Sequence, residues 1–352
     1  MNKISYGQLF TLLTALKAFS LICSGRPADT EQMLGAAISV ILQMMAAIPM
    51  LMLYRKKNFS LKNEMLLGKL GKLLYSLFFI LWGAVSLTDL WGVTTSVYFP
   101  VDSSFKCAVL IGIVCLYISF LGISATARSS TAIFGLLIFS IAVLAIGAYP
   151  KIELSNLLPD VSGRGVISSA VDDFCTSGEL PVLFVLLEYT KTSRSKGTSL
   201  FFIGKLVLIE LVSFIEITVL GRIMDISDYP FFSAGAHSQP FSVQRSDALY
   251  MILFTMLCVI SITLLLSLTS VLVKEIIPGF KYSAVLSIVL MLSASWAMNR
   301  YKINAGYIYG GLILLLAVIL PLIMLIRRTV NEKTSHSDSR SADHTDGLPE
   351  GN

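Results

Sequence analysis

Ten long apolar stretches, separated by shorter polar connections, run along most of this chain. A helix needs about 20 mostly apolar residues to cross the hydrocarbon core of a bilayer. We therefore predict an all-α integral membrane protein with ten transmembrane helices. The ten windows cover residues 6–25, 32–53, 73–98, 105–126, 131–149, 166–187, 199–221, 248–271, 282–298 and 306–326.

The first and sixth windows are the weakest of the ten. The first contains Lys17, Ser20 and Ser24, and the sixth is interrupted by polar residues between Asp172 and Pro181. Many secondary transporters are inverted repeats whose broken helices occupy corresponding positions in the two halves. The pattern therefore favours a five-plus-five inverted repeat with broken first and sixth helices, although two marginal windows can also coincide by chance.

The composition is that of a membrane protein. Of the 352 residues, 55% are hydrophobic and 14% are charged, whereas a soluble domain carries about 25% charged residues. The net charge of +5 comes from Lys and Arg beside the spans, so no nucleic-acid partner is expected. Residues 1–328 are predicted to form one transmembrane domain, and residues 329–352 a disordered cytoplasmic tail.

Lys and Arg are unevenly distributed over the predicted loops. If the N-terminus is cytoplasmic, the loops on that side hold about twice as many Lys and Arg as the loops on the other side. Short cytoplasmic loops carry this excess in membrane proteins, so both termini are expected in the cytoplasm. The densest block lies between the second and third windows and consists of Arg55, Lys56, Lys57, Lys62, Lys69 and Lys72.

Several ionisable residues fall inside the spans, where each costs at least about 2.5–3.5 kcal/mol on insertion scales. Lys17 lies about midway along its window. It could form a structural ion pair with a carboxylate on another span, for which Glu210 is one possibility, or contact an acidic group of a ligand. Lys205 is expected to extend to the nearby membrane surface, whereas Glu216 lies deeper.

Two further regions are candidates for ligand binding. Asp89 lies close to Trp82 and Trp91, where it is either hydrated at the interface or part of a site. The sixth window contains Gly178 and Pro181, which weaken a helix. It predicts either an ordinary kink or unwound backbone facing a ligand. The candidate substrate-binding residues are Lys17, Ser20, Asp89, Thr176, Ser177, Gly178 and Glu179.

Sequence motifs of enzymes are absent. There is no GxSxG, HExxH or phosphate-binding glycine loop, and the three histidines lie outside the windows. The five cysteines show no spacing typical of a metal site. We therefore expect a non-enzymatic protein without a cofactor or a bound metal.

Several local runs resemble the endospore germination permease family, the B-subunits of spore germinant receptors in the amino acid–polyamine–organocation superfamily. They are residues 4–10 (ISYGQLF), 121–128 (LGISATAR), 214–221 (FIEITVLG) and the later Tyr229-Pro230. This resemblance implies a five-plus-five fold with a pocket between spans one, three, six and eight. In that setting Arg128 and Glu210 are expected to have structural or coupling roles.

The resemblance also implies partners and a location. Members work with an A-type subunit and a lipid-anchored C-type subunit in the inner membrane of the spore, where they are thought to sense small nutrients such as amino acids. This chain departs from the pattern at Lys17, where typical members have an unwound, glycine-containing stretch. Lys17 could replace the missing backbone donors or block the pocket.

Three functions follow from these observations. The leading one is a transporter-like receptor subunit that binds a small nutrient and triggers germination with its partners. The alternative is a secondary amino-acid permease coupled to an ion gradient, in the spore membrane or the cell membrane. The third is an assembly subunit with a vestigial pocket.

Overall fold

The protein is described here from a computed structural model. It covers residues 3–23, 29–55, 68–98, 101–157, 163–191, 193–238, 247–302 and 306–330. The predicted tail at 331–352 and the basic residues Lys56, Lys57 and Lys62 lie outside these ranges, and the last helix continues to Val330. Within them the chain is almost entirely helical, and its one pair of bridged extended residues is Ile4 and Thr190.

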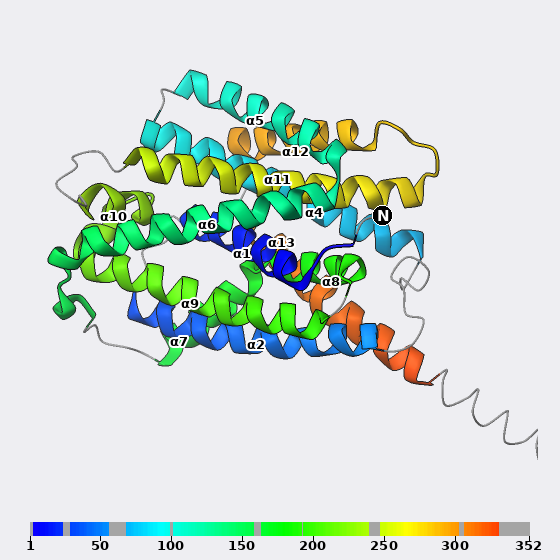
Figure 1. Ribbon diagram of the computed structural model, residues 1–352, viewed down its shortest axis with the longest axis horizontal. Coiled ribbons are helices and arrows are strands. Elements are labelled where there is room, and N and C mark those ends of the chain that lie inside the picture. The colour runs from blue at the N-terminus through cyan, green and yellow to red at the C-terminus, as the bar shows by residue number, and fades with distance from the viewer. Residues whose placement is uncertain are drawn as a thin grey trace, which may run out of the picture.

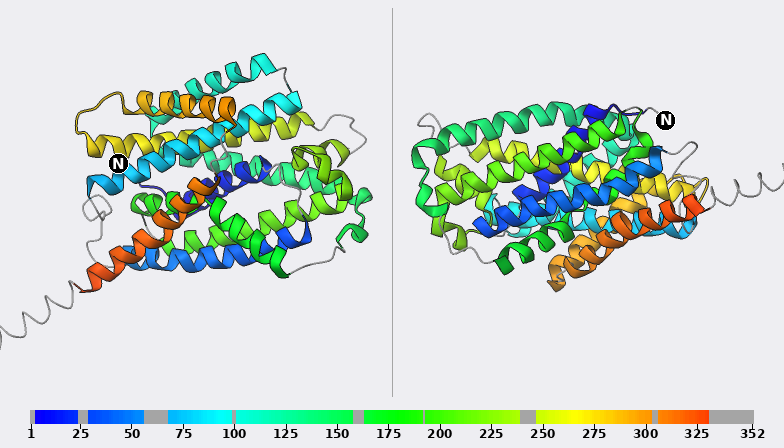
Figure 2. Two further views of the ribbon diagram at one scale, coloured as in Figure 1. Left: turned by 180° about the vertical axis from the view of Figure 1, so that it is seen from behind. Right: turned by 90° about the horizontal axis from the view of Figure 1, so that it is seen from below.

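The helices run roughly along the long axis of the molecule as a bundle (Figures 1 and 2). Between α9 and α11 the short helix α10 lies at one end of the bundle, which we call the α10 end. The helix bounds are α1 (Tyr6–Ile22), α2 (Thr30–Arg55), α4 (Lys69–Val93), α5 (Val101–Leu121), α6 (Ile123–Ala148), α7 (Gly163–Thr176), α8 (Glu179–Tyr189), α9 (Arg194–Leu220), α10 (Pro230–Ser238), α11 (Asp247–Ile276), α12 (Ser283–Tyr301) and α13 (Gly306–Leu314), with π-helical turns after α4 (η1, Thr94–Tyr98) and after α13 (η6, Leu315–Ile319).

Five helices of the described chain are long and apolar enough to cross a membrane, and two shorter ones are also apolar. Large apolar side chains remain exposed on the outside of the bundle. Leu110 and Phe120 on α5, for example, are 62% and 63% exposed, as are Ile41 and Met45 on α2 at 60% each. Contact with lipid tails avoids the free-energy cost of exposing such apolar surfaces to water. The chain is an all-α membrane-embedded protein.

Helix α1 lies inside the bundle. Its start is fixed by a capping box, in which the Ser5 side chain accepts from the Gln8 amide and the Gln8 side chain accepts from the Ser5 amide. Just before it, the Ile4 amide donates to the Tyr189 carbonyl, and the Lys191 amide donates to the Ile4 carbonyl. The predicted break in the first helix does not occur within Tyr6–Ile22, where the helix is continuous.

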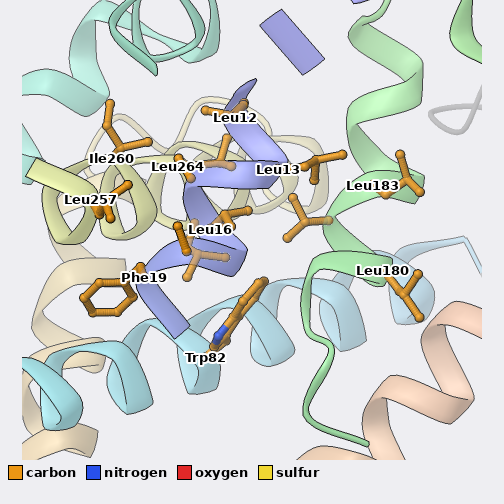
Figure 3. Close-up of a cluster of buried hydrophobic side chains, with 14 of the residues drawn as sticks. Leu12, Leu13, Leu16, Phe19, Trp82, Leu180, Leu183, Leu257, Ile260 and Leu264 are labelled. Carbon is orange, nitrogen blue, oxygen red and sulfur yellow. The ribbon is translucent and has the colours of Figure 1, made fainter. Parts of the chain in front are cut away.

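Around α1 the core is formed by leucine and aromatic side chains from four helices. Figure 3 shows Leu12, Leu16 and Phe19 of α1 against Leu257 and Ile260 of α11, with Trp82 of α4 and α8 residues close by. This close packing holds α1 at the centre of the membrane domain.

The sixth window is broken, as predicted. α7 ends at Thr176 and α8 begins at Glu179, with Ser177 and Gly178 between them. The Gly178 amide donates to the Thr176 carbonyl at 2.9 Å, and the Leu180 amide donates to the Ser177 carbonyl at 3.2 Å. These short-range bonds replace the regular helical ladder, so the backbone turns irregularly inside the bundle.

Helix packing relates distant parts of the chain. α1 packs against α9 and α6, while α7 packs against α2 and α13. α4 packs against α11 and α12, and α11 also packs against α5 and α6. α8 packs against α1 and α2, and Lys205 of α9 donates to Ser177, so the break between α7 and α8 lies among these three helices.

Candidate functional site

A buried polar cluster surrounds the break between α7 and α8. Its members come from α1, α2, α7, α8 and α9, and form one connected set of hydrogen bonds and ion pairs. We call it the charge cluster; it consists of Lys17, Ser39, Gln43, Asp173, Ser177, Glu179 and Lys205.

Lys17 is paired with a carboxylate on the sixth span. Its Nζ lies 2.9 Å from Oδ1 of Asp173, and the Lys17 residue is only 5% exposed. The ion pair therefore neutralises an amine that would be costly alone at this depth. Of the two readings of Lys17, the structure provides the ion pair, but the partner is Asp173 rather than Glu210.

Lys205 is also paired and buried, contrary to the prediction that it extends to the membrane surface. Its side chain is fully buried and forms a salt bridge with Glu179, whose side chain is 1% exposed. Lys205 Nζ also contacts Oε1 of Gln43 at 2.5 Å and Oγ of Ser177 at 3.1 Å. The prediction failed because Glu179, Gln43 and Ser177 each offer Lys205 an acceptor inside the bundle.

Gln43 joins the two ion pairs. Lys205 can only donate, so Gln43 Oε1 faces it and Nε2 faces the other side. From there Nε2 lies 3.1 Å from Oδ2 of Asp173, 2.7 Å from Oγ of Ser177 and 2.8 Å from Oγ of Ser39. The cluster therefore contains two amines and two carboxylates, and its charges balance if all four are ionised.

Sequence reasoning missed Ser39, Gln43, Asp173 and Lys205 as site residues. Ser39 and Gln43 lie one turn apart on α2, so their side chains share a face of the helix. An amide in an otherwise apolar span was the available signal, because such a group needs a hydrogen-bonding partner within the protein.

Gly178 lies against two aromatic side chains. A Cβ atom at this position would come within 2.0 Å of Tyr309 Oη and 2.9 Å of the Trp82 ring. Tyr309 in turn stacks on Phe78, with ring centroids 5.3 Å apart. The glycine is thus required by close approach of α4 and α13 to the break.

Asp89 lies on the same face of α4 as Trp82, because seven residues correspond to almost two full helical turns. Within the described part of the chain, its carboxylate has no hydrogen-bond or ion-pair partner. Asp89 is within electrostatic range of Tyr309 and Tyr229. Asp89 therefore lies two helical turns along α4 from Trp82, the α4 residue that contacts the break.

The other predicted site residues lie outside the charge cluster. Ser20 is half-buried on α1, and exposed Thr176 donates to main-chain carbonyls of Asp172 and Asp173. Arg128 is exposed near the start of α6. Glu210 is half-buried on α9 and does not contact Lys17.

In the ranges covered by the structure, no group of three His, Cys, Asp or Glu residues could hold a metal ion. The polar side-chain groups at the break are amines, carboxylates, an amide and hydroxyls. Such groups recognise small polar ligands or hold helices together.

No family model matches the chain, and no curated protein matches it significantly. The functional argument therefore depends on the residues and their geometry.

Proposed function

We propose that the chain is a ten-span, permease-like protein built as a five-plus-five inverted repeat. Counting α7 and α8 as one span, each helix of the first half would correspond to the helix five spans later. The packing of α1 on α9 then corresponds to that of α7 on α2, and the packing of α1 on α6 to that of α7 on α13. The pairs α4–α12 and α11–α5 are likewise related. This repeated pattern supports the inverted repeat.

The function that we propose for this fold is binding of a small nutrient next to the break in the sixth span. The observation that carries it is the irregular backbone at Ser177 and Gly178, buried in the bundle among ionisable side chains. Irregular backbone at membrane depth is tolerated where protein buries it or where it lines a cavity. Ionisable residues at this depth are also characteristic of ligand and ion pathways.

We further propose that the chain acts as a receptor subunit with A-type and lipid-anchored C-type partners in a spore membrane, as its resemblance to germination permeases implies. Its amino-terminal and carboxy-terminal ends would then lie in the cytoplasm. A ligand can drive such a response only if it binds two conformations with different affinity. The break between α7 and α8 is the element that could differ between them.

Germination of spores carrying variants tests this role. Gly178→Leu would fill the space occupied by Tyr309 and Trp82, and should abolish the nutrient response. Gly135→Leu is the matched control, because no atom lies within 4 Å of a Cβ there. Both proteins should be quantified in spore membranes. An unchanged response with Gly178→Leu at normal protein level would refute binding at the break.

A second candidate is an ion-coupled amino-acid permease. It is favoured by Glu216, a buried carboxylate of α9 for which the described chain shows no partner and which could carry a proton. Proteoliposomes containing this chain alone distinguish the candidates. Accumulation of labelled amino acid driven by a proton gradient, and lost in Glu216→Gln, would identify a permease. Binding without accumulation would favour the receptor subunit.

A further inference from the structure

Asp89 differs from the carboxylates of the charge cluster because no described residue pairs with it. Lys17 and Lys205 are the two amines buried there, and each already has its own carboxylate. Neither amine is therefore free to pair with Asp89 or with an acidic group of a ligand. Among the described residues, the region beside the charge cluster has an excess of one carboxylate.

The surroundings of Asp89 are aromatic and weakly polar. Cys23, Cys258, Tyr229 and Tyr309 all lie within electrostatic range of its carboxylate. None of these four side chains carries a positive charge. One turn further along α4, a Cβ at Gly92 would come 2.3 Å from Tyr229 Oη, so this glycine lets the tyrosine approach the same helix.

Tyr309 supplies a second and independent feature. Its hydroxyl is buried and, in the described part of the chain, has no hydrogen-bond partner. The hydroxyl lies against Gly178, while the ring lies 6.3 Å from the Trp82 ring, centroid to centroid. A buried hydroxyl normally finds a partner. An unused one beside the break is available to a bound molecule.

A carboxylate next to aromatic rings is the arrangement that recognises organic ammonium groups. The carboxylate supplies charge-assisted hydrogen bonds, and the ring faces of Trp and Tyr attract the cation. We propose that Asp89 binds the ammonium group of the ligand, with the rings of Tyr229 and Tyr309 beside it. This inference depends on the proposed nutrient-binding function and narrows the ligand to molecules with an amine. A free carboxylate on the ligand is not required, because Lys17 is already occupied.

A panel of matched compounds tests the proposal on the full chain in lipid nanodiscs. Alanine, leucine and phenylalanine are each compared with the amine that lacks the carboxylate and with the acid that lacks the amine. Binding is measured as the shift in the thermal unfolding midpoint, since a ligand stabilises the state that it binds. We expect shifts with at least one amino acid and its amine, and none with the corresponding acids.

Variants assign the effect to Asp89. Asp89→Asn should weaken binding of the amines at least tenfold, whereas Asp228→Asn, which alters an exposed carboxylate at the α10 end, should bind as the wild type does. Acids that bind when amines do not would overturn the inference and leave nutrient binding intact. A shift produced by sodium chloride alone, lost in Asp89→Asn, would indicate a metal cation instead. If no compound of the panel binds, nutrient binding itself fails, and the inference with it.

Discussion

The charge cluster and the surroundings of Asp89 treat carboxylates in opposite ways. In the cluster, Asp173 and Glu179 each have a lysine, and Gln43 connects the two pairs. Asp89 has aromatic neighbours, and no cationic side chain of the described residues pairs with it. A paired charge stabilises the arrangement of helices around it, whereas an unpaired one is available to a ligand.

The largest effect is expected at the most buried pair. Lys205→Met leaves Glu179 unpaired with a side chain only 1% exposed, so we expect a loss of about 3–5 kcal/mol of stability. The thermal unfolding midpoint of the purified protein measures it. In the double variant Lys205→Met/Glu179→Gln no charge is left unpaired, so much of the loss should be recovered. Equal losses in the single and double variants would contradict the structural role of the pair.

A smaller effect is expected at Lys17. In Lys17→Met the Asp173 carboxylate loses one charged partner but keeps Gln43, and its side chain is 17% exposed. We therefore expect a loss of about 1.5–3 kcal/mol, the range for a hydrogen bond to a charged group. Binding of the amine probes should change less than threefold in the folded protein. A tenfold loss of binding at unchanged stability would show that Lys17 contacts the ligand instead.

Gly178→Ala tests the contact between the two regions. The added methyl group would overlap Tyr309 Oη and the Trp82 ring, and such overpacking costs about 1–3 kcal/mol. Gly135→Ala is a control with open space at the same atom. Chemical denaturation in detergent compares them. If removal of the hydroxyl in Gly178→Ala/Tyr309→Phe restored no stability, the overlap with Tyr309 would not be the cause.

The smallest effect on stability is expected at Asp89. Because Asp89→Asn removes no ion pair, its unfolding free energy should change by less than about 1 kcal/mol. Binding of the amine probes should nevertheless fall at least tenfold. A large loss of stability in Asp89→Asn would mean that Asp89 belongs with the structural charges after all.

Some features of the site could be predicted from the sequence alone. Gly178 and the polar residues around it predicted the break in the sixth span. The depth of Lys17 predicted either a carboxylate partner on another helix or a contact with the ligand, and the structure shows the carboxylate partner. The identity of that partner could not be predicted, because Lys17 and Asp173 are 156 residues apart. The expected break in the first helix was wrong for Tyr6–Ile22, where the helix is continuous and Lys17 pairs with Asp173 of another helix.

By itself, the sequence determined that the chain is helical and membrane-embedded. Apolar stretches of this length match the thickness of a bilayer, and a helix satisfies all the backbone hydrogen bonds of such a stretch within the stretch itself. It also located the interrupted helix through its local residues. Only the tertiary structure decided which charges neutralise one another and which carboxylates of the described chain have no partner. Pairing depends on distances of about 3 Å between side chains on different helices, and the order of residues along one chain does not contain those distances.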